Sequence, residues 1–149
     1  MSDEDCNRAL LRCFYEELWI KGNVEMIPEL LAEDFVDHHA LSGTPPGREG
    51  LAALVATCRT AFLDMCETCE ELIAFGDQLL GRFTMSGRRS GEFMDVPLWA
   101  RVTMSGIDIV RVAGGKITEF WCGEHLLELM HQRGAVPDFA ANYAAQDER

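Results

Sequence analysis

Residues 106–121 read GIDIVRVAGGKITEFW, and this stretch carries the clearest structural signal in the chain. Apolar residues alternate with other residues on both sides of Gly114 and Gly115, which is typical of half-buried β-strands. Adjacent glycines accept the positive φ that a tight hairpin turn requires. The stretch therefore predicts a β-hairpin with strands over about 106–113 and 116–122.

Further strands are predicted before this hairpin, over about 69–75, 78–86 and 92–105. The chain ahead of them has a helical pattern instead. It predicts a helix over 7–19, a short helix over 24–31 that restarts or bends at Pro28, and a third helix with an apolar stripe from Leu51 to Met65. A last short helix is predicted over 124–133. Three N-terminal helices followed by strands indicate the α+β class, with the helices packed on a curved, mixed or antiparallel sheet. Such an arrangement forms a cone with room for one pocket.

Length and charge restrict the class of function. The 149 residues fit a single domain over 1–149, whose last part, 137–149, is a polar tail. The formal net charge of -12 has the wrong sign for nucleic acid or for an anionic membrane. The N-terminus is acidic, and no apolar run approaches the roughly 20 residues of a membrane span. We therefore expect a cytoplasmic protein that binds a small molecule.

The six cysteines permit three readings: disulfides, a metal site, or reduced core residues. Cys66 and Cys69 form a single C-x-x-C, without the second pair or the two spaced histidines that a structural zinc site needs. Cys6, Cys13 and Cys58 lie among apolar residues in helical patterns, where a thiol behaves as a small hydrophobe. We expect reduced cysteines in the core and no metal.

Acid–base chemistry on a small molecule fits the remaining polar residues. The chain has no glycine-rich phosphate loop, no G-x-S-x-G and no H-E-x-x-H. Because histidine exchanges protons near neutral pH, the candidates are His38, His39, His125 and His131, together with the carboxylates Asp108 and Glu124. His131 fits a solvated helix face better, and His39 and Asp108 are also candidates for substrate binding. Uninterrupted alternation after residue 117 would direct Trp121 and His125 to one face and Glu124 to the other.

Arginines and tryptophans within the strand patterns are candidates for substrate binding. Arg82 and Arg101 would bind a carboxylate or enolate oxygen if they point inward, and the alternative is a solvated face. Trp99 and Trp121 suit a flat aromatic ligand and serve equally well as core residues.

Several motifs together resemble the SnoaL-like polyketide cyclases, also called the ester cyclase family. They are AEDFVDHHA at 32–40, PPGREGLAAL at 45–54, the strand region beginning GRFTMSGRR at 81, and GIDIVRVAGGKITEFW, and the resemblance covers about residues 8–136. It implies the nuclear transport factor 2-like α+β cone and a homodimer that associates through the sheet.

The resemblance also implies a reaction. The name-giving members close a ring on an aromatic polyketide ester by an intramolecular aldol reaction, without metal or organic cofactor. Their acid/base residue is an Asp four residues after the signature Trp, and His125 holds that position here. A histidine can perform the same proton transfers. The resemblance further implies a catalytic role for His38, in the VDH motif, and ligand contacts for Arg82 and Arg101.

Other functions remain open on the same fold. A hydroxylase or an isomerase acting on a polyketide-derived substrate is one alternative, because folds of this kind carry several reactions. A non-catalytic small-molecule binding protein is the other.

Overall fold

The computed structural model describes residues 2–40, 43–90 and 101–124. Helix α1 (Asp3–Phe14) continues into a π-helical turn η1 (Tyr15–Ile20), a 3-10 turn η2 (Val24–Met26) and the short helix α2 (Ile27–Leu30). Strand β1 (Leu31–Asp37) and helix α3 (Gly47–Ala61) follow. The rest is strand: β2 (Cys66–Phe75), β3 (Gln78–Arg88), β4 (Arg101–Ala113) and β5 (Lys116–Glu124). The predicted α+β class is confirmed.

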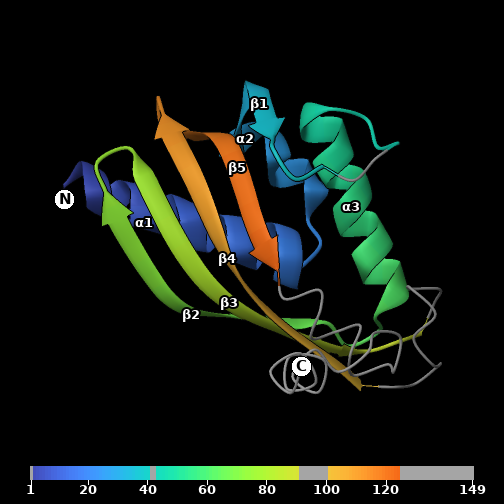
Figure 1. The fold of residues 1–149 in the computed structure, drawn as a ribbon. Coiled ribbons are helices and arrows are strands. Elements are labelled where there is room, and N and C mark those ends of the chain that lie inside the picture. Colours follow the sequence, from blue (N-terminus) through green and yellow to red (C-terminus); the bar gives the residue numbers. More distant parts are fainter. Residues whose placement is uncertain (1, 41–42, 91–100, 125–149) are drawn as a thin grey trace, which may run out of the picture.

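The described strands form one open sheet in the order β1-β5-β4-β3-β2. β1 runs parallel to β5, and the other neighbours are antiparallel, so the sheet is mixed. Figure 1 shows α1 crossing one face of the sheet, α3 standing beside the β1 edge, and β2, β3 and β4 curving beneath them. We call the face that the helices cover the inner face and the opposite face the outer face.

The hairpin predicted from residues 106–121 is confirmed. β4 and β5 pair across a turn in which Gly114 and Gly115 have φ of 59° and 74°, values that L side chains rarely adopt. The predicted strands over 92–105 and 106–113 are one strand where the chain is described, β4, and residues 91–100 lie outside the described part. Strand β1 was not predicted, because its sequence LAEDFVD does not alternate regularly.

The helix boundaries differ from the predicted ones at three places. α1 begins at Asp3 rather than Asn7, because Ser2 and Asp5 form a capping box. α3 ends at Ala61 and not at Met65, because Phe62 is extended and bridges to Arg89. The restart expected at Pro28 is confirmed. Of the helix predicted over 124–133, residue 124 belongs to β5 and the others lie outside the described residues.

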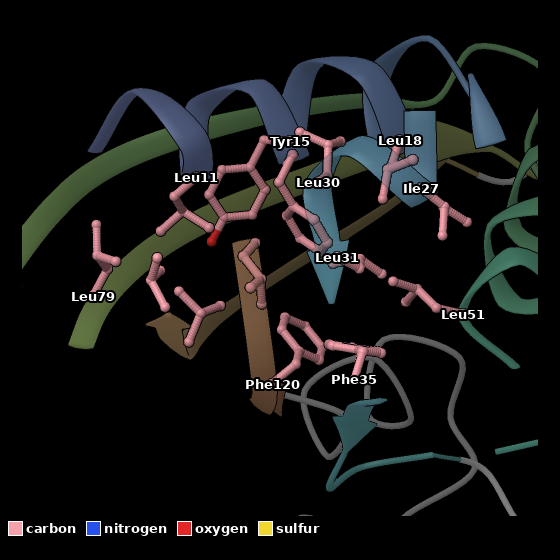
Figure 2. Packing of buried hydrophobic residues seen from close by; sticks show 14 of the residues in the cluster. Leu11, Tyr15, Leu18, Ile27, Leu30, Leu31, Phe35, Leu51, Leu79 and Phe120 are labelled. Atoms are coloured by element: carbon pink, nitrogen blue, oxygen red, sulfur yellow. The ribbon is translucent and has the colours of Figure 1, made fainter. Parts of the chain in front are cut away.

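Two hydrophobic clusters fill the space between the helices and the inner face. The first joins α1, η1, α2 and α3 to the sheet, and Figure 2 shows Leu11, Leu18 and Phe120 within it. The second joins the end of α3 to β3 and β4 and includes Phe62 and Phe83. Trp19 packs against both clusters, as does Cys122. The boundary between the clusters therefore runs across the middle of the inner face.

The cysteines only partly follow the expectation. None of the six forms a disulfide, but Cys6 and Cys66 are exposed rather than in the core. Cys66 precedes the buried Glu67 in β2, so strand alternation turns the cysteine outward. In the described part of the chain, no helix combines the length and apolar character that crossing a membrane would require.

Candidate functional site

A buried carboxylate lies on the inner face between the two hydrophobic clusters. Asp108 is only 3% exposed, and its cross-strand partners are Gly81 on β3 and Cys122 on β5. One neighbouring row on this face, formed by Leu79, Val110 and Phe120, is apolar and buried. A charged group placed there is costly unless it is hydrogen-bonded, so its partners indicate its role.

Tyr15 supplies one such partner from the helical layer. Its hydroxyl Oη donates a hydrogen bond of 2.9 Å to Asp108 Oδ2, and the tyrosine is itself buried. Tyr15 follows Leu11 by four residues on the buried side of the helix, which directs its ring at the sheet. Figure 2 shows the hydroxyl oxygen pointing away from the helix toward the strands. The π-helical turn begins at this residue, and such turns are frequent at functional sites.

The surroundings of Tyr15 are negatively charged. Burial raises the pKa of the Tyr15 hydroxyl far above its usual value, and the charge of Asp108 and the hydrogen bond to it raise this pKa further, with smaller effects from Glu67 and Cys69. Glu67 is 7% exposed. Burial is also the main cause that raises the pKa of Cys69. Tyr15 therefore keeps its proton at any pH at which the protein is expected to work and serves as a permanent hydrogen-bond donor.

A bulge in β5 decides which residues share the face of Asp108. Val112 pairs with Ile117 but Arg111 pairs with Glu119, so one extra residue stands in β5. The alternation predicted to run unbroken from residue 117 is therefore wrong. Phe120 is buried on the inner face, and Trp121 is opposite the partly exposed Ile109 on the outer face.

His38 lies with Trp121 on the outer face. The two rings stack at a centroid distance of 4.5 Å and an interplanar angle of 3°. His38 Nε2 is 3.1 Å from Glu119 Oε1, and that glutamate also pairs with Arg111. The structure thus brings His38 together with Trp121, and it separates both from Asp108 by the sheet.

His39 lies at the edge of the sheet near the centre of β5. Its Nδ1 accepts a hydrogen bond of 3.3 Å from the backbone N–H of Cys122, the residue that pairs with Asp108. Its own backbone N–H donates to Asp37. His38 also bonds to β5, through its backbone N–H to Phe120 O, but only the side chain of His39 bonds to the strand pair of Asp108 among the described histidines.

The two predicted substrate-binding arginines form ion pairs at the protein surface. Arg82 Nε is 3.5 Å from Glu71, and Arg101 is 3.3 Å from Asp64. All four side chains are about half exposed. Neither arginine is brought next to Asp108.

Three predicted site residues have no described side chain. His125 and Trp99 lie outside the described residues. Glu124 is the last residue of β5, where its backbone pairs with Gly106, and its side chain is likewise outside the described part.

Tyr15 and Cys122 are site residues that the sequence reasoning missed. A signal for Tyr15 existed, because a tyrosine on the apolar side of a helix needs a partner for its hydroxyl. Asp108 has a similar signal: it stands in the apolar register of β4, with Gly106 before it and Val110 after it. No sequence signal pointed to Cys122, because the face of the sheet on which its side chain lies depends on the bulge in β5.

Two other arrangements are weaker candidates for a site. A shallow hollow between β1 and α3 is lined by Asp37, Ala40, Pro45 and Leu54, among others, but its carboxylate is bonded to the neighbouring His39 backbone. Over residues 2–40, 43–90 and 101–124, no three His, Cys, Asp or Glu side chains are grouped as metal ligands would be. The buried Asp108 and Tyr15 pair remains the better candidate.

Comparison with known proteins identifies the family. The SnoaL-like polyketide cyclase family matches residues 9–133, and the chain belongs to this family. Two solved structures share 30% identity: a proposed polyketide cyclase from Bacillus cereus (TM-score 0.73, 86% of this chain and 80% of that one) and IdmH, a proposed polyketide cyclase from Streptomyces antibioticus (TM-score 0.74, 85% and 96%). TsrD from Streptomyces laurentii has the same fold at 24% identity (TM-score 0.80, 91% and 100%). No curated protein sequence matches the chain.

Proposed function

We propose that this protein is a cyclase that closes a ring on a polyketide-derived small molecule by acid–base catalysis, without metal or organic cofactor, and that Asp108 exchanges the proton. The observation that carries the proposal is the buried carboxylate, hydrogen-bonded by Tyr15, between two hydrophobic clusters of a SnoaL-like chain. Apolar residues of the two clusters lie on either side of this pair, and small-molecule sites combine such apolar surroundings with a few polar groups that orient the ligand.

The proposed reaction is an intramolecular aldol addition. The Asp108 carboxylate takes a proton from a carbon between two carbonyl groups, and an enolate forms. The enolate carbon then bonds to a second carbonyl carbon of the same molecule, and the resulting alkoxide receives the proton back from Asp108. Atoms balance without any co-reactant, and holding the chain folded supplies much of the rate enhancement.

His125 is the competing candidate for the base, by its position in the family motif. Glu124 and His38 are also predicted to be catalytic, and ligand contacts are predicted for His39, Arg82, Trp99, Arg101 and Trp121. Of these residues, His38 and Trp121 lie across the sheet from Asp108, and Arg82 and Arg101 pair with surface carboxylates. The cytoplasmic location is also part of the proposal.

Product analysis of purified variants tests the assignment. Wild-type protein is incubated with linear and tricyclic polyketide methyl esters, and products are followed by mass spectrometry. Asp108→Asn should lower turnover at least about 100-fold while ligand binding persists. The matched control Asp77→Asn, at the exposed turn between β2 and β3, should have wild-type turnover.

Each of the other possible results would lead to a different assignment of the base or of the reaction. Wild-type turnover in Asp108→Asn together with its loss in His125→Ala would move the base to His125. A hydroxylated or isomerised product would replace cyclisation by one of those reactions. Binding of the esters without turnover in the wild type would make the protein a binding protein.

We further propose that two copies associate through the outer face of the sheet. Ile73, Leu80, Ile109 and Trp121 are successive cross-strand partners on this face, so they form an apolar row across four strands. Ile73 is 50% exposed and Ile109 is 39% exposed, and exposed apolar rows of this kind mark interfaces. Ile109→Glu should convert a dimer to a monomer in analytical ultracentrifugation, and a wild-type monomer would refute the proposal.

A further inference from the structure

The contact between Tyr15 and Asp108 depends on a gap in the sheet. Gly81 is the direct cross-strand partner of Asp108. A Cβ atom at residue 81 would stand 2.2 Å from Tyr15 Oη, far inside any permitted contact distance. Only a glycine at this point lets the tyrosine hydroxyl reach the surface of the sheet.

Residues from three separate elements thus make the hydrogen bond between Tyr15 and Asp108 possible. The π-helical turn starts at Tyr15, β3 contributes the space at Gly81, and β4 contributes Asp108. Tyr15 is fixed further by Phe14, whose ring meets it edge-on at a centroid distance of 5.7 Å. The donor is therefore held in place before any ligand arrives.

A hydrogen-bond donor changes whether a buried carboxyl group is ionised. Burial disfavours the charged form of a carboxyl group, and donation to the charged form favours it. A base must be ionised before it can accept a proton. A neutral donor that keeps its own proton stabilises the ionised carboxylate without taking part in the proton transfer.

We propose that Tyr15 is a positioning residue for the reaction: its hydroxyl orients the Asp108 carboxylate and keeps it ionised as the base. This inference rests on the proposed function, because it presumes that Asp108 exchanges the proton. In this role Tyr15 acts through Asp108 and does not take part in the proton transfer.

The titration of Asp108 tests this role without any substrate. In protein labelled with 13C at aspartate carboxyl groups, Asp108 is assigned by the signal that Asp108→Asn removes. Tyr15→Phe keeps the ring and deletes the hydroxyl, so the Asp108 midpoint should rise by about one to two pH units. Thr118→Val is the matched control, because it deletes a half-buried hydroxyl that bonds to Arg111 O instead, and its midpoint should equal that of the wild type.

Gly81→Ala is the second variant and acts from the other side of the contact. It keeps Tyr15 but leaves no room for the hydroxyl, so the Asp108 midpoint should rise in the same direction. If Tyr15→Phe fails to fold, Gly81→Ala still decides. An unchanged or lower midpoint in the variants that fold overturns the inference.

The pH–rate profile gives a readout that a purely structural role would not move. In Tyr15→Phe the acid limb of kcat/KM should shift upward with the Asp108 midpoint, and activity should largely return at higher pH. Equal loss of activity at every pH would contradict the positioning role.

Full turnover in Asp108→Asn would refute the proposed function itself. An inactive Asp108→Asn beside a wild-type titration and profile in Tyr15→Phe would refute this inference alone.

Discussion

The two faces of the sheet use similar residues in different ways. In the described part of the chain the inner face carries two buried carboxylates, Asp108 and Glu67, and Asp108 is hydrogen-bonded by a neutral tyrosine. The outer face carries charged pairs such as Arg82 with Glu71, which stay about half exposed. Exposed pairs contribute little to stability because water screens them, whereas a buried charge is controlled by the few groups that touch it. The comparison teaches that burial, and not the presence of charge, marks the candidate site.

The largest expected difference between the faces is in packing. Phe120 is 4% exposed and its ring lies 5.7 Å from that of Phe14, so Phe120→Ala should cost about 3–5 kcal/mol. Trp121→Ala, one residue further and on the outer face, should cost only about 1–2 kcal/mol. Urea denaturation measures both, and equal losses would contradict the assignment of faces.

Glycine substitutions sharpen the same comparison. Gly81→Ala should lower the free energy of unfolding by about 1–3 kcal/mol, because the new Cβ overlaps the Tyr15 hydroxyl. Gly123→Ala is the matched strand control, since among the described residues its Cβ would meet only Ile107 O, at an ordinary 3.7 Å. The control should change stability by less than about 1 kcal/mol. A tolerant Gly81 would mean that the hydroxyl has room elsewhere.

Thiol reactivity probes the two faces of β2. Cys66 is exposed, whereas Cys69 is half-buried and burial raises its pKa. A raised pKa leaves less reactive thiolate near neutral pH, and the thiolate fraction recovers only as pH rises. Iodoacetamide at pH 7.5 should modify Cys66 at least about ten times faster than Cys69, and the ratio should narrow toward pH 9.5. Peptide mapping by mass spectrometry measures this, and urea-unfolded protein should show nearly equal rates.

The smallest effect is expected for an outer ion pair. Arg82→Gln breaks its contact with Glu71, and the free energy of unfolding should change by less than about 1 kcal/mol. High salt should remove most of the difference, because screening weakens the pair in the wild type too. Denaturation at low and high salt tests this, and a loss above about 2 kcal/mol would show that Arg82 does more than pair at the surface.

The fold was largely predictable from local patterns. The glycine turn at Gly114–Gly115 and the helix restart at Pro28 both follow from backbone chemistry within a few residues. The strand β1 was missed because its pairing with β5 joins segments far apart in the chain. The end of α3 was misplaced because Phe62 and Met65 continue the apolar spacing of the helix and are also buried beyond its end, so their apolar character could not show where the helix stops.

The candidate site was predictable only in part. Asp108 was among the candidate residues, and its place in the apolar register of β4 is visible in the sequence. Its hydrogen-bond partner Tyr15 was not predictable, because Tyr15 lies 93 residues earlier in the chain and no local sequence pattern links the two residues. The face of Trp121 was misassigned because a single bulge residue reverses the alternation of everything after it.

The sequence by itself determined the class of fold, the hairpin at residues 106–121 and the resemblance to the SnoaL-like family, since periodicity, turn glycines and motifs are properties of short segments. Only the tertiary structure decided that Tyr15 meets Asp108 over Gly81 and that His38 lies with Trp121 on the opposite face. The physical reason is register: which side of a sheet a side chain occupies depends on how distant strands pair, and one extra residue changes it.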